Sequence, residues 1–148
     1  MRVIFLMMIG LSLLYAVITR DVATGIVSDS TTGLQWQDNE VGTATTWEDA
    51  IDRCENLTLG THSDWRLPNV NELKSIVDRS RIYPAIKEGL VNTVASPNDY
   101  WSSTTYERDK NRAWCTDFAS GTVHRKIIAD DNSSKSSNNY VRCVRGGD

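Results

Sequence analysis

Basic residues in the C-terminal third form the most suggestive chemical pattern in this sequence. They fall into two short groups: Arg108, Lys110, Arg112 and His124, Arg125, Lys126. If a hairpin brings the two groups together, their cationic side chains face one side and can bind sulfate or carboxylate groups of a polysaccharide. Tyr106 lies beside the first group, where its ring can stack on a sugar.

The same cations also have a structural interpretation. Neighbouring strand residues point to opposite faces, so Arg125 and Lys126 need not act on one ligand. Several acidic residues are near enough in the sequence to pair with the cations: Glu107, Asp109, Asp117 and Asp130. The sequence leaves both interpretations open.

Oxygen-rich side chains give a second candidate, a calcium site. The residues are Asn98, Asp99, Asp130 and Asp131. Calcium prefers carboxylate and amide oxygens, which these residues supply. Solvated turns and side-chain caps explain the same residues without an ion, and we favour that interpretation.

No pattern in the sequence indicates catalysis. The acidic residues are scattered, and none is paired with a base in a short motif. His62 and His124 stand alone and the cysteines form no CxxC pair, so a zinc site is disfavoured. We therefore expect a protein that is not an enzyme and that needs no cofactor.

The charge balance argues against two classes of partner. The net charge is -3 at pH 7, and the pI is about 5.4. Binding to nucleic acid or to an anionic membrane surface usually requires a basic patch or a high pI. We expect no nucleic-acid partner.

The N-terminal segment differs from the rest of the chain. Arg2 precedes an apolar run from Val3 to Val17, and Leu14-Tyr15-Ala16 loosely matches a cleavage site. We predict that residues 1–19 are a secretory signal peptide. The alternative is an uncleaved N-terminal anchor, although the run is shorter than the roughly 20 residues that span a bilayer. Either way we expect an exported protein, secreted, periplasmic or at the cell surface, with one domain at residues 24–147.

A corner at Asp64–Asn69 should position the middle of this domain. Pro68 disfavours helix for the residue before it, and Asn69 with Glu72 reads as a capping box that starts a helix ending near Asp78. Trp65 is a large apolar core candidate, and Arg66 beside it needs a carboxylate partner if it is buried. Anion binding by Arg66 is the functional alternative.

The region before this corner is predicted to contain a hairpin and a helix. Strands from Ile26 and over Leu34–Gln37 flank a turn at Ser30–Gly33. A helix then starts at a capping box, either Thr45 with Glu48 or Thr46 with Asp49, and Gly60 marks its end. Its apolar stripe includes Cys54.

The C-terminal half is predicted to be mainly strands. Tyr100–Thr104 and Ala113–Phe118 read as strands, and a turn at Ala119–Gly121 leads into a third over Thr122–Ile128. Residues 130–139 read as a polar loop, and Tyr140–Arg145 as a half-buried strand. All five tryptophans are assigned to the core: Trp36, Trp47, Trp65, Trp101 and Trp114. The predicted class is α+β, with two helices packed on a mainly antiparallel sheet and long loops.

Several stretches, in this order, resemble the Lcl C-terminal domain family. They are Thr32-Gly33-Leu34-Gln35-Trp36-Gln37, Trp47 with Ala50 and Cys54, Asp64-Trp65-Arg66-Leu67-Pro68-Asn69 with Glu72-Leu73, Tyr100-Trp101-Ser102-Ser103, and Val141-Arg142-Cys143-Val144-Arg145-Gly146. The family is named for the C-terminal domain of a Legionella collagen-like adhesin. The resemblance implies a bacterial extracellular module related to the C-type-lectin-like and formylglycine-generating-enzyme-like folds. The named adhesin recognises sulfated glycosaminoglycans, and its domain assembles as a trimer.

The resemblance also implies a disulfide. C-type-lectin-like folds commonly tie the first helix to the last strand, which here corresponds to Cys54 and Cys143. Cys115 would then be a buried thiol in a strand. Pairing of Cys115 with Cys143 across neighbouring strands is the alternative.

Together these features predict an exported, adhesin-like recognition module. Its expected ligand is an anionic glycan or another extracellular polymer on a host or other surface, bound by the loops after Tyr100. One alternative is a self-assembling surface or appendage subunit, for which the family suggests a homo-oligomer, a trimer. A weaker alternative is a periplasmic enzyme.

Overall fold

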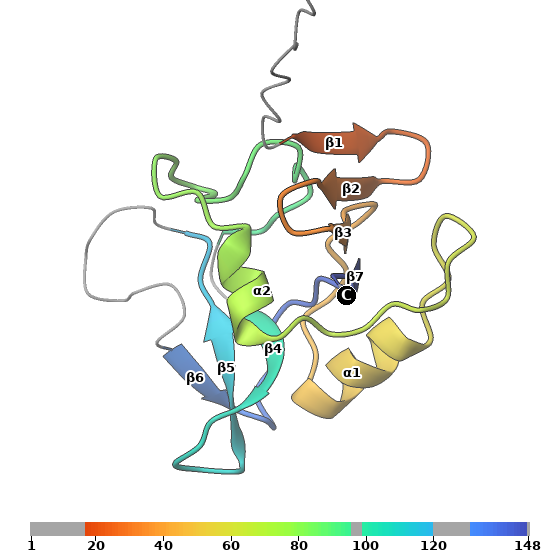
Figure 1. Ribbon diagram of the computed structural model, residues 1–148. Coiled ribbons are helices and arrows are strands. Elements are labelled where there is room, and N and C mark those ends of the chain that lie inside the picture. Colours follow the sequence, from red (N-terminus) through yellow and green to blue (C-terminus); the bar gives the residue numbers. More distant parts are fainter. Residues whose placement is uncertain (1–16, 96–98, 120–130, 148) are drawn as a thin grey trace, which may run out of the picture.

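The computed structural model describes residues 17–95, 99–119 and 131–147, and it confirms the α+β class (Figure 1). Two helices and two antiparallel sheets make up this part of the chain. Residues 1–16 of the predicted signal peptide therefore lie outside the described residues. Ile18 and Thr19, which the prediction also included, belong to strand β1. Neither helix in the described ranges is long and apolar enough to cross a membrane.

The first sheet has the strand order β1-β2-β3-β7. Its strands are β1 (Ile18–Asp21), β2 (Ile26–Asp29), β3 (Leu34–Gln37) and β7 (Val144–Gly146). The predicted hairpin is confirmed, with Ile26 opposite Gln37 and Asp29 opposite Leu34. Gly33 ends the turn with φ of +70°, a left-handed conformation that glycine adopts at little cost. The last strand starts later than predicted, at Val144.

Helix α1 (Trp47–Glu55) begins at one of the two predicted capping pairs, Thr46 with Asp49. Thr46 is the N-cap, and its hydroxyl accepts from the backbone N–H of Asp49. Cys54 is fully buried on the inner face. The helix ends at Glu55 rather than near Gly60, because Asn56 closes it through its backbone N–H and its side-chain amide, both of which donate to the carbonyl of Asp52.

Helix α2 (Val70–Ser75) begins at the predicted capping box. The Asn69 side chain accepts from the backbone of Glu72, and the Glu72 carboxylate accepts from the Asn69 N–H. This helix is shorter than predicted, since it ends before Asp78. The predicted carboxylate partner of Arg66 is the same Glu72, bound by both guanidinium nitrogens at 2.8 and 2.7 Å.

The second sheet has the order β4-β5-β6. Its strands are β4 (Tyr100–Thr105), β5 (Arg112–Thr116) and β6 (Asp131–Ser134). The predicted strand at residues 122–128 lies outside the described residues. Strand β5 lies between β4 and β6, and β6 falls within the stretch that the sequence predicted as a loop. Residues 79–95 form no helix and run as turns and irregular chain.

The core forms two clusters of buried side chains, packed among the two sheets and the two helices. Trp36, Trp65 and Trp101 are buried, which confirms their assignment. Trp47 is only partly buried against the core, and Trp114 is partly exposed and belongs to neither cluster. The assignment of these last two to the core was therefore too simple, because both side chains stay partly exposed.

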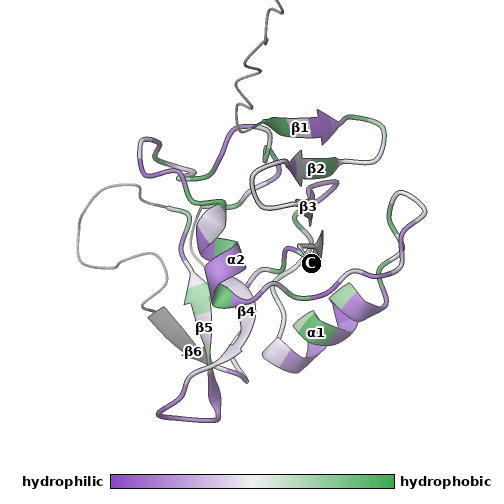
Figure 2. Cartoon of the chain, in the orientation of Figure 1, coloured by the Kyte–Doolittle hydropathy of each residue, from purple (hydrophilic) through white to green (hydrophobic). Residues whose placement is uncertain are grey.

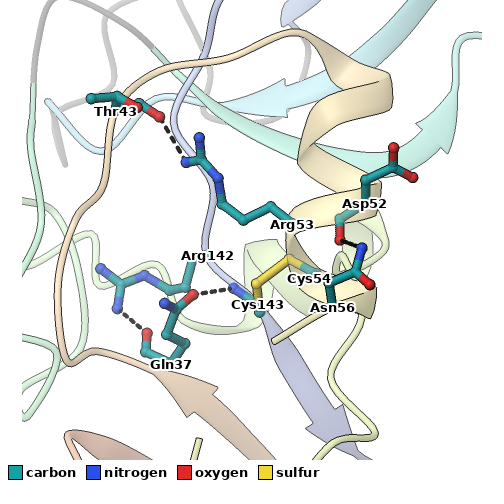
Figure 3. Close-up of a disulfide and its surroundings, with 8 residues drawn as sticks. All are labelled: Gln37, Thr43, Asp52, Arg53, Cys54, Asn56, Arg142 and Cys143. Atoms are coloured by element: carbon teal, nitrogen blue, oxygen red, sulfur yellow. Dashed lines mark hydrogen bonds between the residues drawn. A yellow bond between two sulfur atoms is a disulfide. The ribbon is translucent and has the colours of Figure 1, made fainter. Parts of the chain in front are cut away.

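The disulfide joins Cys54 to Cys143, as the resemblance implied (Figure 3). It links α1 to the segment immediately before β7, and the Cys143 backbone N–H donates to the side chain of Gln37 on β3. Cys115 is buried in β5 and is not disulfide-bonded. One cross-link therefore ties the first helix to the sheet of the N-terminal half.

Candidate functional site

The turn between β4 and β5 carries the first predicted basic group. Backbone hydrogen bonds from Tyr106 N to Arg112 O, and from Arg112 N to Asp109 O, close this turn. Arg108 and Lys110 protrude from it and are exposed. The turn forms the hydrophilic tip of a long hairpin (Figure 2).

An aromatic pair supports the base of this hairpin tip. The rings of Tyr106 and Trp114 lie 5.2 Å apart between centroids and meet edge to face. Both are partly exposed. Tyr106 thus lies where the sequence predicted a contact for a sugar, but part of its ring is already occupied by Trp114. Tyr140, which follows the polar residues after β6, packs against Tyr100.

A polar cleft of about 610 Å³ opens beside the hairpin tip. It lies between the start of α1, the β4–β5 turn and the residues that follow β6. Its lining consists of two lysines, one glutamate, three hydroxyl residues and one amide: Lys110, Lys135, Glu48, Thr46, Ser134, Ser136 and Asn111. The size is in the usual range of pockets for small ligands.

Lys135 is the most ordered cation of this cleft. Its ammonium group lies 3.8 Å from the centroid of the Trp47 ring and donates to the Thr105 hydroxyl at 3.0 Å. The backbone of Lys135 is also fixed, because its N–H donates to Asn111 O and its carbonyl accepts from Trp47 N. The contacts hold the side chain against the cleft wall.

Three cations of the tip and the cleft are not ion-paired within the described part of the chain. Arg108, Lys110 and Lys135 form no ion pair with any described residue. Arg112 differs from them in position, because it lies in β5 opposite Ser134 and is partly buried. The structure thus places Arg108 and Lys110 at one tip, with Lys110 and Lys135 at the adjoining cleft.

Three other arginines of the domain, Arg20, Arg142 and Arg145, have carboxylate partners. Arg142 is buried and donates to Asp38 at 2.6 Å, and Arg20 binds the other oxygen of the same carboxylate. Arg145 donates to Asp64 at 2.7 Å, and this hydrogen bond lowers the pKa of the Asp64 carboxyl. These charges stabilise the fold and are not available to a ligand.

The Arg66 pair behaves in the same way. Burial alone raises the pKa of Glu72, but hydrogen bonds from Arg66 and from the Asn69 backbone outweigh it, so that the pKa is lowered. Since two guanidinium nitrogens bind this carboxylate, Arg66 links the corner to the start of α2.

Several predicted site residues lie outside the described chain: His124, Arg125, Lys126, Asn98 and Asp130. Of the remaining calcium candidates, Asp131 is described only through its backbone in β6. Asp99 accepts a hydrogen bond from the thiol of Cys115 at 3.3 Å. Among the described residues there is no group of three or more acidic, histidine or cysteine side chains that could hold a metal ion.

Sequence reasoning missed Lys135 and the role of Trp47. Lys135 lies in a serine-rich stretch that reads as a solvated loop. Trp47 fits the apolar stripe of a helix equally well with or without a cation over its ring. Only the proximity of two segments distant in the sequence shows that the two residues act together.

The fold is that of a small α+β domain with one disulfide, built around a tryptophan-rich core. The model of the Lcl C-terminal domain family matches residues 25–145, and the chain belongs to this family. This confirms the resemblance seen in the motifs. A search of curated proteins found no match.

Proposed function

We propose that this protein is an exported, non-enzymatic recognition domain that binds an anionic extracellular polysaccharide through the β4–β5 tip. The observation that carries the proposal is the exposure of Arg108 and Lys110 without an ion pair in the described chain. Membership of a family named for an adhesin supports the same class of function.

The distribution of charge supports a local rather than a general attraction to anions. The net charge of -3 disfavours nonspecific binding to polyanions, because the whole molecule repels them at long range. Arg20, Arg142 and Arg145 are neutralised by carboxylates. A polyanion can therefore be attracted locally at the hairpin tip, where Arg108 and Lys110 are exposed and form no ion pair with a described residue.

The test is binding to heparin and to neutral dextran, each at low and moderate salt, with and without calcium. Heparin should bind more tightly, and its affinity should fall as salt screens the exposed charges. Each exposed charge pair contributes about 0.2–1 kcal/mol, so Arg108→Gln with Lys110→Gln should weaken binding by about 2- to 30-fold.

A matched control removes the same charges elsewhere. Arg79 and Lys74 are exposed and lie outside the tip, so Arg79→Gln with Lys74→Gln should leave the affinity nearly unchanged. Equal losses in both double variants would show that only net charge matters and would contradict the proposal. Absence of binding to heparin and dextran, together with concentration-dependent oligomers in solution, would instead favour a self-assembling surface subunit.

A further inference from the structure

The ammonium group of Lys135 is fixed in space but has no anionic partner in the described chain. Its contacts are the Trp47 ring at 3.8 Å and the Thr105 hydroxyl at 3.0 Å. A cation over an aromatic face gains electrostatic energy from the ring, but the positive charge remains. One hydroxyl acceptor also leaves further N–H donors of the ammonium group available.

This geometry lowers the cost of binding an anion. Lysine side chains in water lose rotamer entropy when a ligand orders them, and this loss weakens binding. The side chain of Lys135 is already ordered by Trp47 and Thr105, and its backbone is bonded on both sides. The structure thus holds a pre-organised cation at the cleft wall.

The remaining groups of the cleft indicate the kind of anion. Ser134 and Ser136 contribute hydroxyl groups that hydrogen-bond each other at 2.8 Å, and Asn111 contributes an amide. Such groups exchange hydrogen bonds with sugar hydroxyls, because each can donate and accept. A ligand rich in hydroxyl groups fits this lining better than an apolar one.

Glu48 limits the negative charge that the cleft accepts. Glu48 lines the same cleft as Lys110 and Lys135. A sugar unit with several sulfate groups would place like charges near the Glu48 carboxylate, which is unfavourable. A unit with one carboxylate and several hydroxyls matches two cations and one anion more closely.

We propose that this cleft binds a hexuronate unit of the polysaccharide, with Lys135 contacting the carboxylate and the serine hydroxyls and Asn111 contacting the sugar hydroxyls. This inference rests on the proposed function, and it adds a residue outside the predicted basic groups. It also names the class of sugar, a carboxylated one.

The test uses tetragalacturonate and its methyl ester as probes, measured by calorimetry with the oxidised full domain. The acid should bind and the ester should bind at least tenfold more weakly, because esterification removes the charge but keeps the hydroxyls. Lys135→Gln should reduce binding of the acid to the level of the ester. Lys74→Gln, which removes an exposed lysine on α2, should not change it.

Two further measurements separate a binding role from a folding role. The thermal midpoint of Lys135→Gln should remain within a few degrees of the wild type, and Lys135→Arg should restore part of the binding. Equal binding of acid and ester, or unchanged binding in Lys135→Gln, would overturn the inference.

The tip variant distinguishes the two proposals. Arg108 does not line the cleft, so Arg108→Gln should weaken heparin binding more than tetragalacturonate binding. Heparin binding without tetragalacturonate binding would overturn the hexuronate inference and leave the proposed function standing. Failure of heparin, tetragalacturonate and neutral chains alike would overturn both.

Discussion

The disulfide between Cys54 and Cys143 should contribute a large part of the stability of this domain. The bonded cysteines are 89 residues apart in the sequence, and both are fully buried. Breaking the bond leaves the folded contacts largely in place but releases a long loop in the unfolded chain. The perturbation is therefore reduction of the wild-type protein, which keeps both sulfur atoms.

The size of the effect follows from loop-closure entropy. For a loop of 89 residues, the chain-entropy relation gives about -15.5 cal/mol/K, or about 4.6 kcal/mol at 25 °C. Native proteins are stable by about 5–15 kcal/mol, so this loss would remove from a third to nearly all of the stability. The reduced domain should therefore be measurably less stable than the oxidised one.

The assay is equilibrium unfolding in urea, with and without reductant. The midpoint should fall, and the slope of free energy against urea should rise, because the reduced unfolded chain exposes more surface. Cys54→Ala with Cys143→Ala should behave like the reduced protein. Cys115→Ala is the control, since it removes a buried thiol without opening a loop, and it should cost about 1 kcal/mol. A loss below about 1 kcal/mol on reduction, or an equal loss in the control, would refute the reasoning.

Three other predictions concern charges and turns. Asp38→Asn should lower the free energy of unfolding in urea by about 3–5 kcal/mol, because it leaves the buried Arg142 without a carboxylate; a cost near zero would contradict this. Gly25→Ala should destabilise more than Gly33→Ala, by about 1–3 kcal/mol in thermal unfolding. Both have φ near +70°, but a Cβ at 25 would lie 2.5 Å from a backbone Cα while a Cβ at 33 meets nothing within 4 Å; equal costs would exclude this clash. Because the pKa of Glu72 is lowered in the folded protein, its ionised carboxylate stabilises the fold above the unfolded pKa, near 4.5. This stabilisation is lost as the pH falls through the pKa of the folded state. The stability difference between wild type and Glu72→Gln should therefore shrink as pH falls below about 4.5, and a difference independent of pH would refute it.

The local part of the fold could be predicted because its signals act over a few residues. The capping box of Asn69 and Glu72 fixed the start of α2, and the turn before Leu34 fixed the first hairpin. Helix ends were predicted less well. Asn56 closes α1 several residues before Gly60, which shows that a capping side chain can end a helix before a glycine is reached.

Strand partners were harder to predict, because pairing joins segments that are distant in the sequence. β6 was assigned to a loop, since Asp131–Ser134 is polar and lacks an apolar alternation. Its backbone nevertheless pairs with β5, because the hydrogen bonds between strands join backbone groups and need no apolar alternation.

The sequence by itself determined the family, the α+β class, the capped helix starts and the need of Arg66 for a carboxylate. Each depends on neighbouring residues or on an ordered set of motifs. The tertiary structure alone decided that Asp38 neutralises Arg142 and that Lys135 lies over Trp47. In both cases the partners are remote in the chain. Only the packing of sheets, helix and turns brings the Arg142 guanidinium to its carboxylate and the Lys135 ammonium to an aromatic ring.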